Sequence, residues 1–226
     1  MAKRTCLVTQ EIFMRKYFLI FIVLSACPQS IWSRPVSYPG GVTLDITNNA
    51  DEHSALIHYS PTAKYSVGLR AEYRRQAEYT LTSLQLNNLL NRWNNKDSQA
   101  NLYLKSGVGY ANRNSSRFGN DTSFAAFTGI GADWETRRYF TSYENRYINA
   151  GSIDDNFVQK ARVGIAPYIA DYGKLHTWLM LELEHNPEDQ DNITITPLVR
   201  FFKDVHRIEA GISNNNDVLF NWTVRF

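Results

Sequence analysis

The last nine residues, Val218–Phe226 (VLFNWTVRF), alternate between large apolar and mostly polar side chains. An alternation with a period of two residues is that of a β-strand with one apolar and one polar face. Large apolar side chains on a terminal strand in water would promote aggregation, whereas on a membrane-spanning barrel they face the lipid. The ending therefore favours the closing strand of a transmembrane β-barrel over the alternative, a terminal strand of a soluble β-sandwich.

The same alternation recurs throughout the chain, most clearly in Tyr65–Arg74. There, tyrosines stand at both ends of the apolar side, as in the aromatic girdles of membrane barrels, and three charged residues lie on the reverse. The pattern predicts an all-β, antiparallel transmembrane barrel of about twelve strands, an even number that places both chain ends in the periplasm. The segment Tyr79–Trp93 breaks the phase at Leu81 and Leu89, which predicts a bulge or a short helix. Ten strands are the alternative if this segment and a neighbour are not strands.

Two further boundaries follow from composition and phase. Ala111–Thr122 is rich in Asn, Ser and Gly, and we expect it to be the longest loop and to lie outside the cell. The alternation that starts near Ala161 predicts that its strand runs as far as Ile169, with Tyr168 on the inner side.

A final strand of alternating apolar residues that ends in Phe resembles the closing strand of Gram-negative outer-membrane β-barrels. The resemblance implies that Phe220, Trp222, Val224 and Phe226 form a signal that the barrel-assembly machinery reads. It also implies that the protein lies in outer-membrane lipid. Because the match covers nine residues by motif and the rest by pattern, it indicates a small porin-like architecture and no particular family.

The N-terminal segment has the features of an export signal. Arg15 and Lys16 precede a ten-residue apolar run, Tyr17–Ala26, which is too short to span a bilayer. We therefore predict a signal peptide over residues 1–33, with Met14 as a possible alternative start.

Processing of this signal has two alternatives. Ordinary cleavage would fall near Ser33, whereas the sequence around Cys27 resembles a lipoprotein box and would leave a lipidated Cys27. The mature chain would then consist of a proline-containing periplasmic lead-in, residues 34–40, and the barrel, residues 41–226.

Charge and cysteine content exclude several classes of function. The formal net charge of +2 includes four basic and one acidic residue before Arg34, and without them 20 basic and 21 acidic residues leave a net charge of −1. A body without excess positive charge does not support nucleic-acid binding. Both cysteines also precede Arg34, so the mature body has no disulfide framework, Cys-ligated zinc or Cys nucleophile. We expect no cofactor and no metal.

The polar sides of the predicted strands would line the interior. Twelve strands give a backbone radius of about 12 Å, and Arg side chains reach about halfway to the axis. The interior would therefore be a narrow pore or a space closed by ion pairs. Nine basic and seven acidic residues are predicted to point inward: Arg70, Arg74, Lys105, Arg146, Lys160, Arg162, Arg200, Arg207, Arg225, Asp45, Glu72, Asp133, Glu144, Glu182, Glu184 and Glu209.

One charge asymmetry favours transport of anions. Arg200, Arg207 and Arg225 lie on three successive predicted strands near the periplasmic end, with only Glu209 among them. We therefore predict a small outer-membrane channel for hydrophilic solutes, with anions favoured. The alternative is a barrel with a closed lumen and a structural or adhesive role through its outer loops.

A third reading, an outer-membrane lipid-modifying enzyme, rests on one motif. His58-Tyr59-Ser60 resembles the His-x-Ser pair of outer-membrane lipid deacylases, although the predicted topology places no acid beside His58. His58, His176 and His206 would all lie at the periplasmic rim, where a metal site is the less favoured interpretation and ordinary interfacial residues the favoured one. We predict that the protein is not an enzyme.

Overall fold

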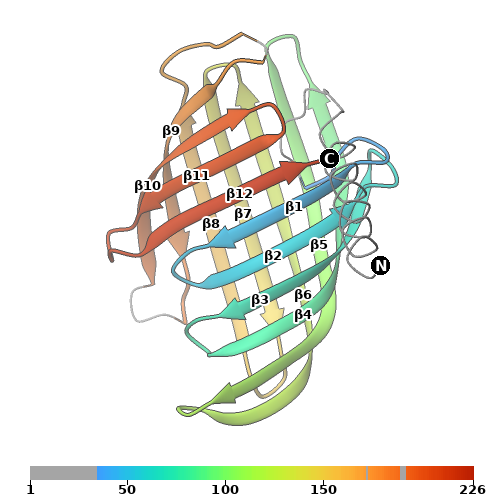
Figure 1. Ribbon diagram of the computed structural model, residues 1–226, viewed down its shortest axis with the longest axis vertical. Coiled ribbons are helices and arrows are strands. Elements are labelled where there is room, and N and C mark those ends of the chain that lie inside the picture. The colour runs from blue at the N-terminus through green and yellow to red at the C-terminus, as the bar shows by residue number, and fades with distance from the viewer. Residues whose placement is uncertain (1–34, 172, 189–191) are drawn as a thin grey trace, which may run out of the picture. The chain divides into compact units, whose positions relative to one another are not determined.

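The computed structural model describes residues 35–171, 173–188 and 192–226, and these form a closed antiparallel barrel of twelve strands (Figure 1). The predicted signal peptide and Cys27 lie outside the described residues. The strands are β1 (Val42–Asn48), β2 (Glu52–Tyr59), β3 (Tyr65–Arg74), β4 (Tyr79–Asn94), β5 (Ser98–Ser115), β6 (Gly119–Thr136), β7 (Tyr139–Asn149), β8 (Asp155–Ile165), β9 (His176–His185), β10 (Ile193–Lys203), β11 (His206–Ile212) and β12 (Val218–Arg225).

Each strand pairs with its neighbours in chain order, and the ring closes where β12 pairs with β1. The closing ladder runs from Thr43 opposite Arg225 to Asn48 opposite Phe220. The predicted fold class and the count of twelve are confirmed, and the alternative of ten is wrong. No helix in the described part of the chain is long and apolar enough to cross a membrane.

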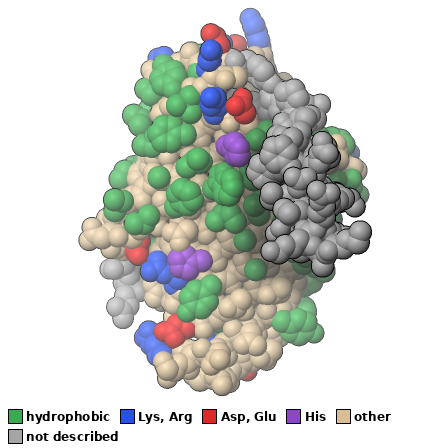
Figure 2. Space-filling view, viewed as in Figure 1, with side chains coloured by type: hydrophobic (Ala, Val, Ile, Leu, Met, Phe, Trp, Pro, Cys, Tyr) green, Lys and Arg blue, Asp and Glu red, His purple; other side chains and the backbone are tan. Residues whose placement is uncertain are grey.

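Alternation sorts the side chains of the barrel into an apolar outer face and a polar inner face. Leu69 and Val163 are 57% and 56% exposed, whereas Glu72 on the strand of Leu69 is 1% exposed. Figure 2 shows apolar side chains spread over one side of the outer wall. Val224 is the exception in β12, because it is 4% exposed although its place in the alternation is an outer one. Apart from such exceptions, this is the distribution expected for strands that face lipid on one side.

The irregular fourth segment is a strand with a bulge. The register between β4 and β5 shifts between Leu89 and Asn91. The outward parity changes there, so Trp93 is exposed although Leu84 and Leu90, of the opposite parity, are exposed too. Leu81 breaks the apolar phase because it points into the barrel, where it is fully buried. The prediction of a bulge is confirmed, and the alternative of a short helix is wrong.

The predicted loop Ala111–Thr122 is wrong. These residues extend β5 and β6, which remain paired up to Ser115 opposite Gly119. Only a three-residue turn separates the strands, and the Ser115 hydroxyl accepts hydrogen bonds from the backbone N–H groups of Arg117 and Phe118 at 3.0 and 3.1 Å. The polar residues form a β-hairpin whose turn is stabilised by Ser115. Asparagine and serine side chains can hydrogen-bond to the backbone in a tight turn as well as in a long loop, so their abundance does not distinguish the two.

The eighth strand is shorter than predicted. It ends at Ile165, and both Tyr168 and Ile169 lie in the connection that follows. The Tyr168 hydroxyl donates to the carbonyl oxygen of Leu175 at 3.0 Å and lies 2.8 Å from the hydroxyl of Thr177. Tyr168 is therefore an exposed residue that ties the connection to β9, and the prediction that it lines the interior is wrong.

Candidate functional site

The interior of the barrel contains the charged residues that alternation predicted there. Seven of the sixteen charged residues predicted to point inward are buried: Glu72, Arg74, Glu182, Glu184, Arg200, Glu209 and Arg225. The other nine are partly buried: Asp45, Arg70, Lys105, Asp133, Glu144, Arg146, Lys160, Arg162 and Arg207. Because a buried charge is costly unless it is paired, their partners decide what the interior can do.

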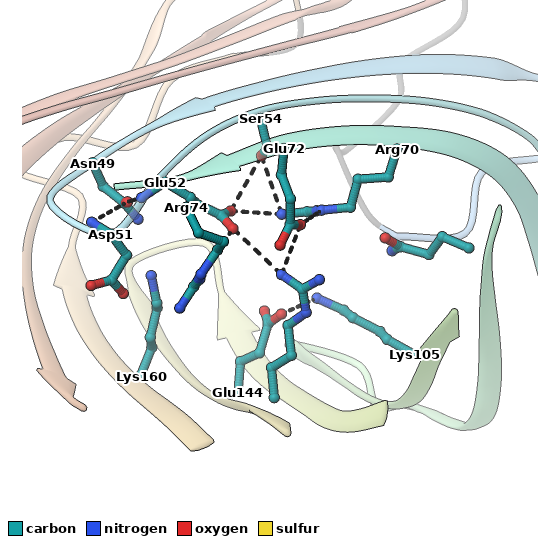
Figure 3. Close-up of polar contacts among 12 residues, drawn as sticks. Asn49, Asp51, Glu52, Ser54, Arg70, Glu72, Arg74, Lys105, Glu144 and Lys160 are labelled. Atoms are coloured by element: carbon teal, nitrogen blue, oxygen red, sulfur yellow. Dashed lines mark hydrogen bonds and ion pairs between the residues drawn. The ribbon is translucent and has the colours of Figure 1, made fainter. Parts of the chain in front are cut away.

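The first group, the Glu72 cluster, consists of Glu52, Arg70, Glu72, Arg74 and Arg146. Arg70 donates to Glu52 at 2.6 Å and also to Glu72. Arg74 lies 3.6 Å from Glu52 on the facing strand. Figure 3 shows the labelled members converging from β2 and β3 toward the interior. The three arginines of the cluster thus share two carboxylates. These ion pairs hold the side chains in place, and the cluster as a whole keeps only a small net charge.

Arg146 connects this cluster to a distant part of the wall. It comes from β7, yet its guanidinium lies 2.9 Å from Glu72 on β3 and 3.4 Å from Glu52 on β2. β3 and β7 are separated by three strands in the ring. A circular barrel with a radius of about 12 Å would hold these walls farther apart than an Arg and a Glu side chain can span together. The walls therefore lie closer here, and the ion pair crosses the lumen.

A neighbouring aromatic ring supports the guanidinium of Arg146. The guanidinium lies over the ring of Phe127 at 4.1 Å from its centroid, a favourable cation–π arrangement. Phe127 in turn occupies the space above Gly107, where an added Cβ would come within 2.3 Å of the ring. Gly107 therefore makes room for Phe127, which positions Arg146 for its contact with Glu72.

Two Lys–carboxylate pairs continue the network. Lys105 donates to Glu144 at 2.6 Å, and Lys160 lies 2.8 Å from Glu184, its direct cross-strand neighbour. Asp51, in the turn after β1, adjoins the second pair. Burial opposes its ionisation, but a hydrogen bond with Glu184 and the positive charge of Lys160 hold the pKa of Asp51 below its usual value.

The second group, the Glu209 cluster, comes from β8, β10, β11 and β12. Glu209 is 1% exposed and accepts from Arg200 at 2.6 Å, Arg162 at 3.1 Å and Asn221 at 2.9 Å. Arg207 lies 3.8 Å from the same carboxylate. Of the three arginines predicted to favour anions, Arg200 and Arg207 both lie beside Glu209. The carboxylate of Glu209 therefore partly compensates their positive charge.

Apolar side chains also fill part of the interior, which the predicted polar lining did not include. One cluster, at the end of the barrel that holds the β3–β4 turn, comprises Tyr79, Leu81, Ala111, Ala125, Phe127, Ile148, Ala150 and Ile153. The other comprises Ala166, Trp178, Met180, Leu198 and Leu219, with Phe140 against it. The guanidinium of Arg200 lies 4.6 Å from the Phe140 ring centroid. The free cross-section is therefore narrower than that of an empty twelve-stranded barrel.

An acidic residue lies beside His58, so the prediction that no acid lies there is wrong. His58 Nε2 lies 3.3 Å from an Asp45 carboxylate oxygen. The Ser60 hydroxyl, however, is fully buried and accepts a hydrogen bond from the backbone N–H of Ser37 at 2.9 Å. A nucleophile must reach its substrate, so this arrangement does not support lipid deacylation.

The three histidines at this end do not converge. His58 is buried in the interior, whereas His206 stacks on Trp222 on the outer side, with ring centroids 6.1 Å apart. His176 lies beside Phe202. Among the described residues, no group of three His, Cys, Asp or Glu side chains could hold a metal ion.

Glu52 is the central residue that the sequence analysis missed, since it is absent from the residues predicted to point inward. It begins β2 and pairs with arginines from both β3 and β7. A signal was present: Glu52 has the same parity as Ser54, Leu56 and His58, which all point inward. Extending the alternation by two residues would have placed it in the lumen.

Together, the closed strand order, apolar outer wall and ion-paired interior are the architecture of a transmembrane β-barrel. A scan of protein-family models and a search of curated proteins give no match. Two solved structures are similar. A KdgM porin in complex with disordered oligogalacturonate has 10% identity and a TM-score of 0.48, and a KdgM porin has 9% identity and a TM-score of 0.46. Each alignment covers 82% of this chain and 98% of the porin.

Proposed function

We propose that this protein is an outer-membrane porin of a Gram-negative bacterium that conducts small hydrophilic solutes. The observation that carries the proposal is the closed barrel with an apolar outer wall and a charged, ion-paired interior. An apolar band matches lipid, and an inner wall of fixed charges lowers the cost of moving a polar solute across it. The side chains that cross or fill the lumen limit passage to small solutes.

A modest preference for anions accompanies this proposal. Around the Glu209 cluster, basic side chains outnumber acidic ones by four to three. The arginines are Arg162, Arg200, Arg207 and Arg225, and the acids are Asp45, Glu182 and Glu209. Fixed positive charge in a narrow pore concentrates anions, and the effect weakens as salt screens it. The preference is therefore small, because each acid already offsets one arginine.

One observation favours a second candidate function. The pairing of Arg146 with Glu72 across the lumen is the kind of contact that would close a barrel. A closed barrel would serve a structural or adhesive role through its outer turns. The lipid-modifying enzyme receives no comparable support, because Ser60 is buried.

Conductance separates the two candidates. Reconstituted protein in a planar bilayer is expected to give discrete small current steps, with a reversal potential under a salt gradient that indicates anion preference. In parallel, membrane fractionation should recover the protein in the outer membrane, as a folded form whose gel migration changes on boiling. Folded, membrane-inserted protein without current steps would favour the closed barrel, whereas recovery in the soluble periplasmic fraction would contradict both candidates.

The C-terminal residue provides a test of assembly. Deleting Phe226 should lower the amount of folded barrel in the outer membrane, because the resemblance assigns the terminal aromatic residue to the assembly signal. Phe226→Tyr is the matched control and should assemble as the parent does, since it keeps an aromatic ring. Heat-dependent gel migration measures the folded fraction, and normal yield of the deletion variant would show that the ending is incidental.

A further inference from the structure

One sector of the outer wall is polar where the rest of the wall is apolar. It crosses five adjacent strands, β5 to β9, near the middle of β5 to β8 and at the end of β9. We call this sector the polar seam, and it consists of Ser106, Thr128, Tyr143, Asn145, Gln159 and His185. Their neighbours in sequence, such as Lys105, Glu144, Lys160 and Glu184, pair inside the barrel, so alternation directs the seam outward.

Hydrogen bonds connect the seam from strand to strand. The Ser106 and Thr128 hydroxyls lie 3.2 Å apart. The Tyr143 hydroxyl donates to Gln159 Oε1 at 2.7 Å, while Asn145 Nδ2 lies 3.4 Å from the Tyr143 hydroxyl. The hydrogen bond of the Gln159 amide nitrogen is also long, since Gln159 Nε2 lies 3.5 Å from His185 Nδ1 on β9. Each amide nitrogen carries two N–H donors, so within the described residues each retains donor capacity that faces outward.

The strands outside the seam provide the contrast. Along the middle of β3, β4 and β10 the outward residues include Leu69, Leu84 and Ile195, all strongly exposed and without polar atoms. Outward amides in hydrocarbon are unfavourable unless they find partners, and a barrel that faced lipid on all sides would have no use for them. The seam therefore points to a side of the barrel that lipid does not cover.

We propose that the polar seam is the interface through which two copies of this chain associate within the membrane. The proposal rests on the membrane location given under the proposed function, but not on conduction, because an open and a closed barrel would present the same seam. Two copies related by a two-fold axis would bring Asn145 and Gln159 of one copy against the same amides of the other.

A second copy fits the seam because the seam is self-complementary. Asn145 and Gln159 each offer a carbonyl oxygen and an amide nitrogen, so each copy supplies the donors and acceptors that the other needs. The seam carries no Lys, Arg, Asp or Glu, so two copies would not repel each other. Its flanks are small outward residues, Ala126, Ala132 and Ala161, which allow two walls to approach closely in lipid.

Cross-linking in intact outer membranes tests the proposal. Ala161→Cys places a thiol on an exposed position at the flank of the seam, and Ala71→Cys places one on an equally outward position of β3, far around the ring. The parent chain, treated identically, controls for its own cysteines. With a short bis-maleimide reagent, Ala161→Cys should give a product of twice the mass of one chain, whereas Ala71→Cys and the parent should not.

A second variant tests the chemistry of the seam. Tyr143→Phe with Gln159→Leu removes both partners of one seam hydrogen bond and leaves the bond between Asn145 Oδ1 and the backbone N–H of Ile130. In the Ala161→Cys background it should abolish the dimer band while heat-dependent gel migration shows a folded barrel. If the double variant does not fold, Gln159→Leu alone replaces it.

Three results would overturn the proposal: equal cross-linking at Ala71→Cys, an adduct whose mass is not a multiple of one chain, or no adduct in folded Ala161→Cys. Fractionation of the same membranes reports separately whether the barrel is membrane-inserted. Failure of the dimer is thereby distinguished from failure of the membrane assignment.

Discussion

Glu209→Gln is expected to lower the free energy of unfolding of the barrel by about 3 to 5 kcal/mol, the usual cost of removing one partner from a buried ion pair. Glu209 is 1% exposed and accepts from Arg200 at 2.6 Å and from Arg162 at 3.1 Å. Gln keeps the shape and the hydrogen bond to Asn221 but removes the charge that compensates these arginines. Urea unfolding of the refolded barrel in detergent measures the change.

Glu144→Gln is the matched control for this prediction. Among the described residues Glu144 has one ion-pair partner, Lys105 at 2.6 Å, and its side chain is 46% exposed, so solvent screens the pair. The expected loss is about 0 to 1 kcal/mol, as for other exposed ion pairs. Equal losses in the two variants would mean that the Glu209 cluster contributes no more than an exposed pair.

Arg146→Ala is expected to increase single-channel conductance severalfold. The side chain of Arg146 crosses the lumen from β7 to Glu72 on β3 at 2.9 Å, so truncating it removes a bridge through the pore. It also removes a positive charge beside two carboxylates, which should shift selectivity toward cations. Planar-bilayer recording measures both the current steps and the reversal potential.

Arg75→Ala provides the control for general effects of removing an arginine. Arg75 lies in the β3–β4 turn and pairs with Asp217 at 3.5 Å, outside the strands that line the lumen. The single-channel conductance of Arg75→Ala should match that of the parent. If Arg146→Ala also conducts as the parent does, the narrowest point of the pore lies elsewhere. If neither the parent nor Arg146→Ala conducts, the apolar clusters close the barrel.

Much of the fold is predictable because alternation is a local property. The bounds of β3, Tyr65–Arg74, follow directly from its pattern, and the closing strand β12 begins at the predicted Val218. Phase also predicts that the charged residues point inward, since a charge in lipid is costly. The hairpin around Ser115 was missed because composition alone does not distinguish a loop from paired polar strands.

The contacts inside the barrel are less predictable, because they depend on which distant strands face each other. Nothing local to Arg146 indicates that it reaches Glu72, since the approach of the two walls follows from closure of the whole ring. Leu81 shows the same limit: it breaks the outer phase because it packs with residues from three other strands and a turn. Pattern therefore predicts which face a residue is on, but not its partner across the lumen.

The pairing of β1 with β12 has a consequence for biosynthesis. The first strand has no partner on one edge until the last residues of the chain have been made, so the ladder that completes the ring is also the one with the largest sequence separation. A chain cut short before Val218 would leave β1 and β11 with open backbone edges, which favour aggregation. Ring closure therefore requires β12: a chain that includes Val218–Arg225 can pair every strand edge, whereas a chain that stops before it keeps two edges open.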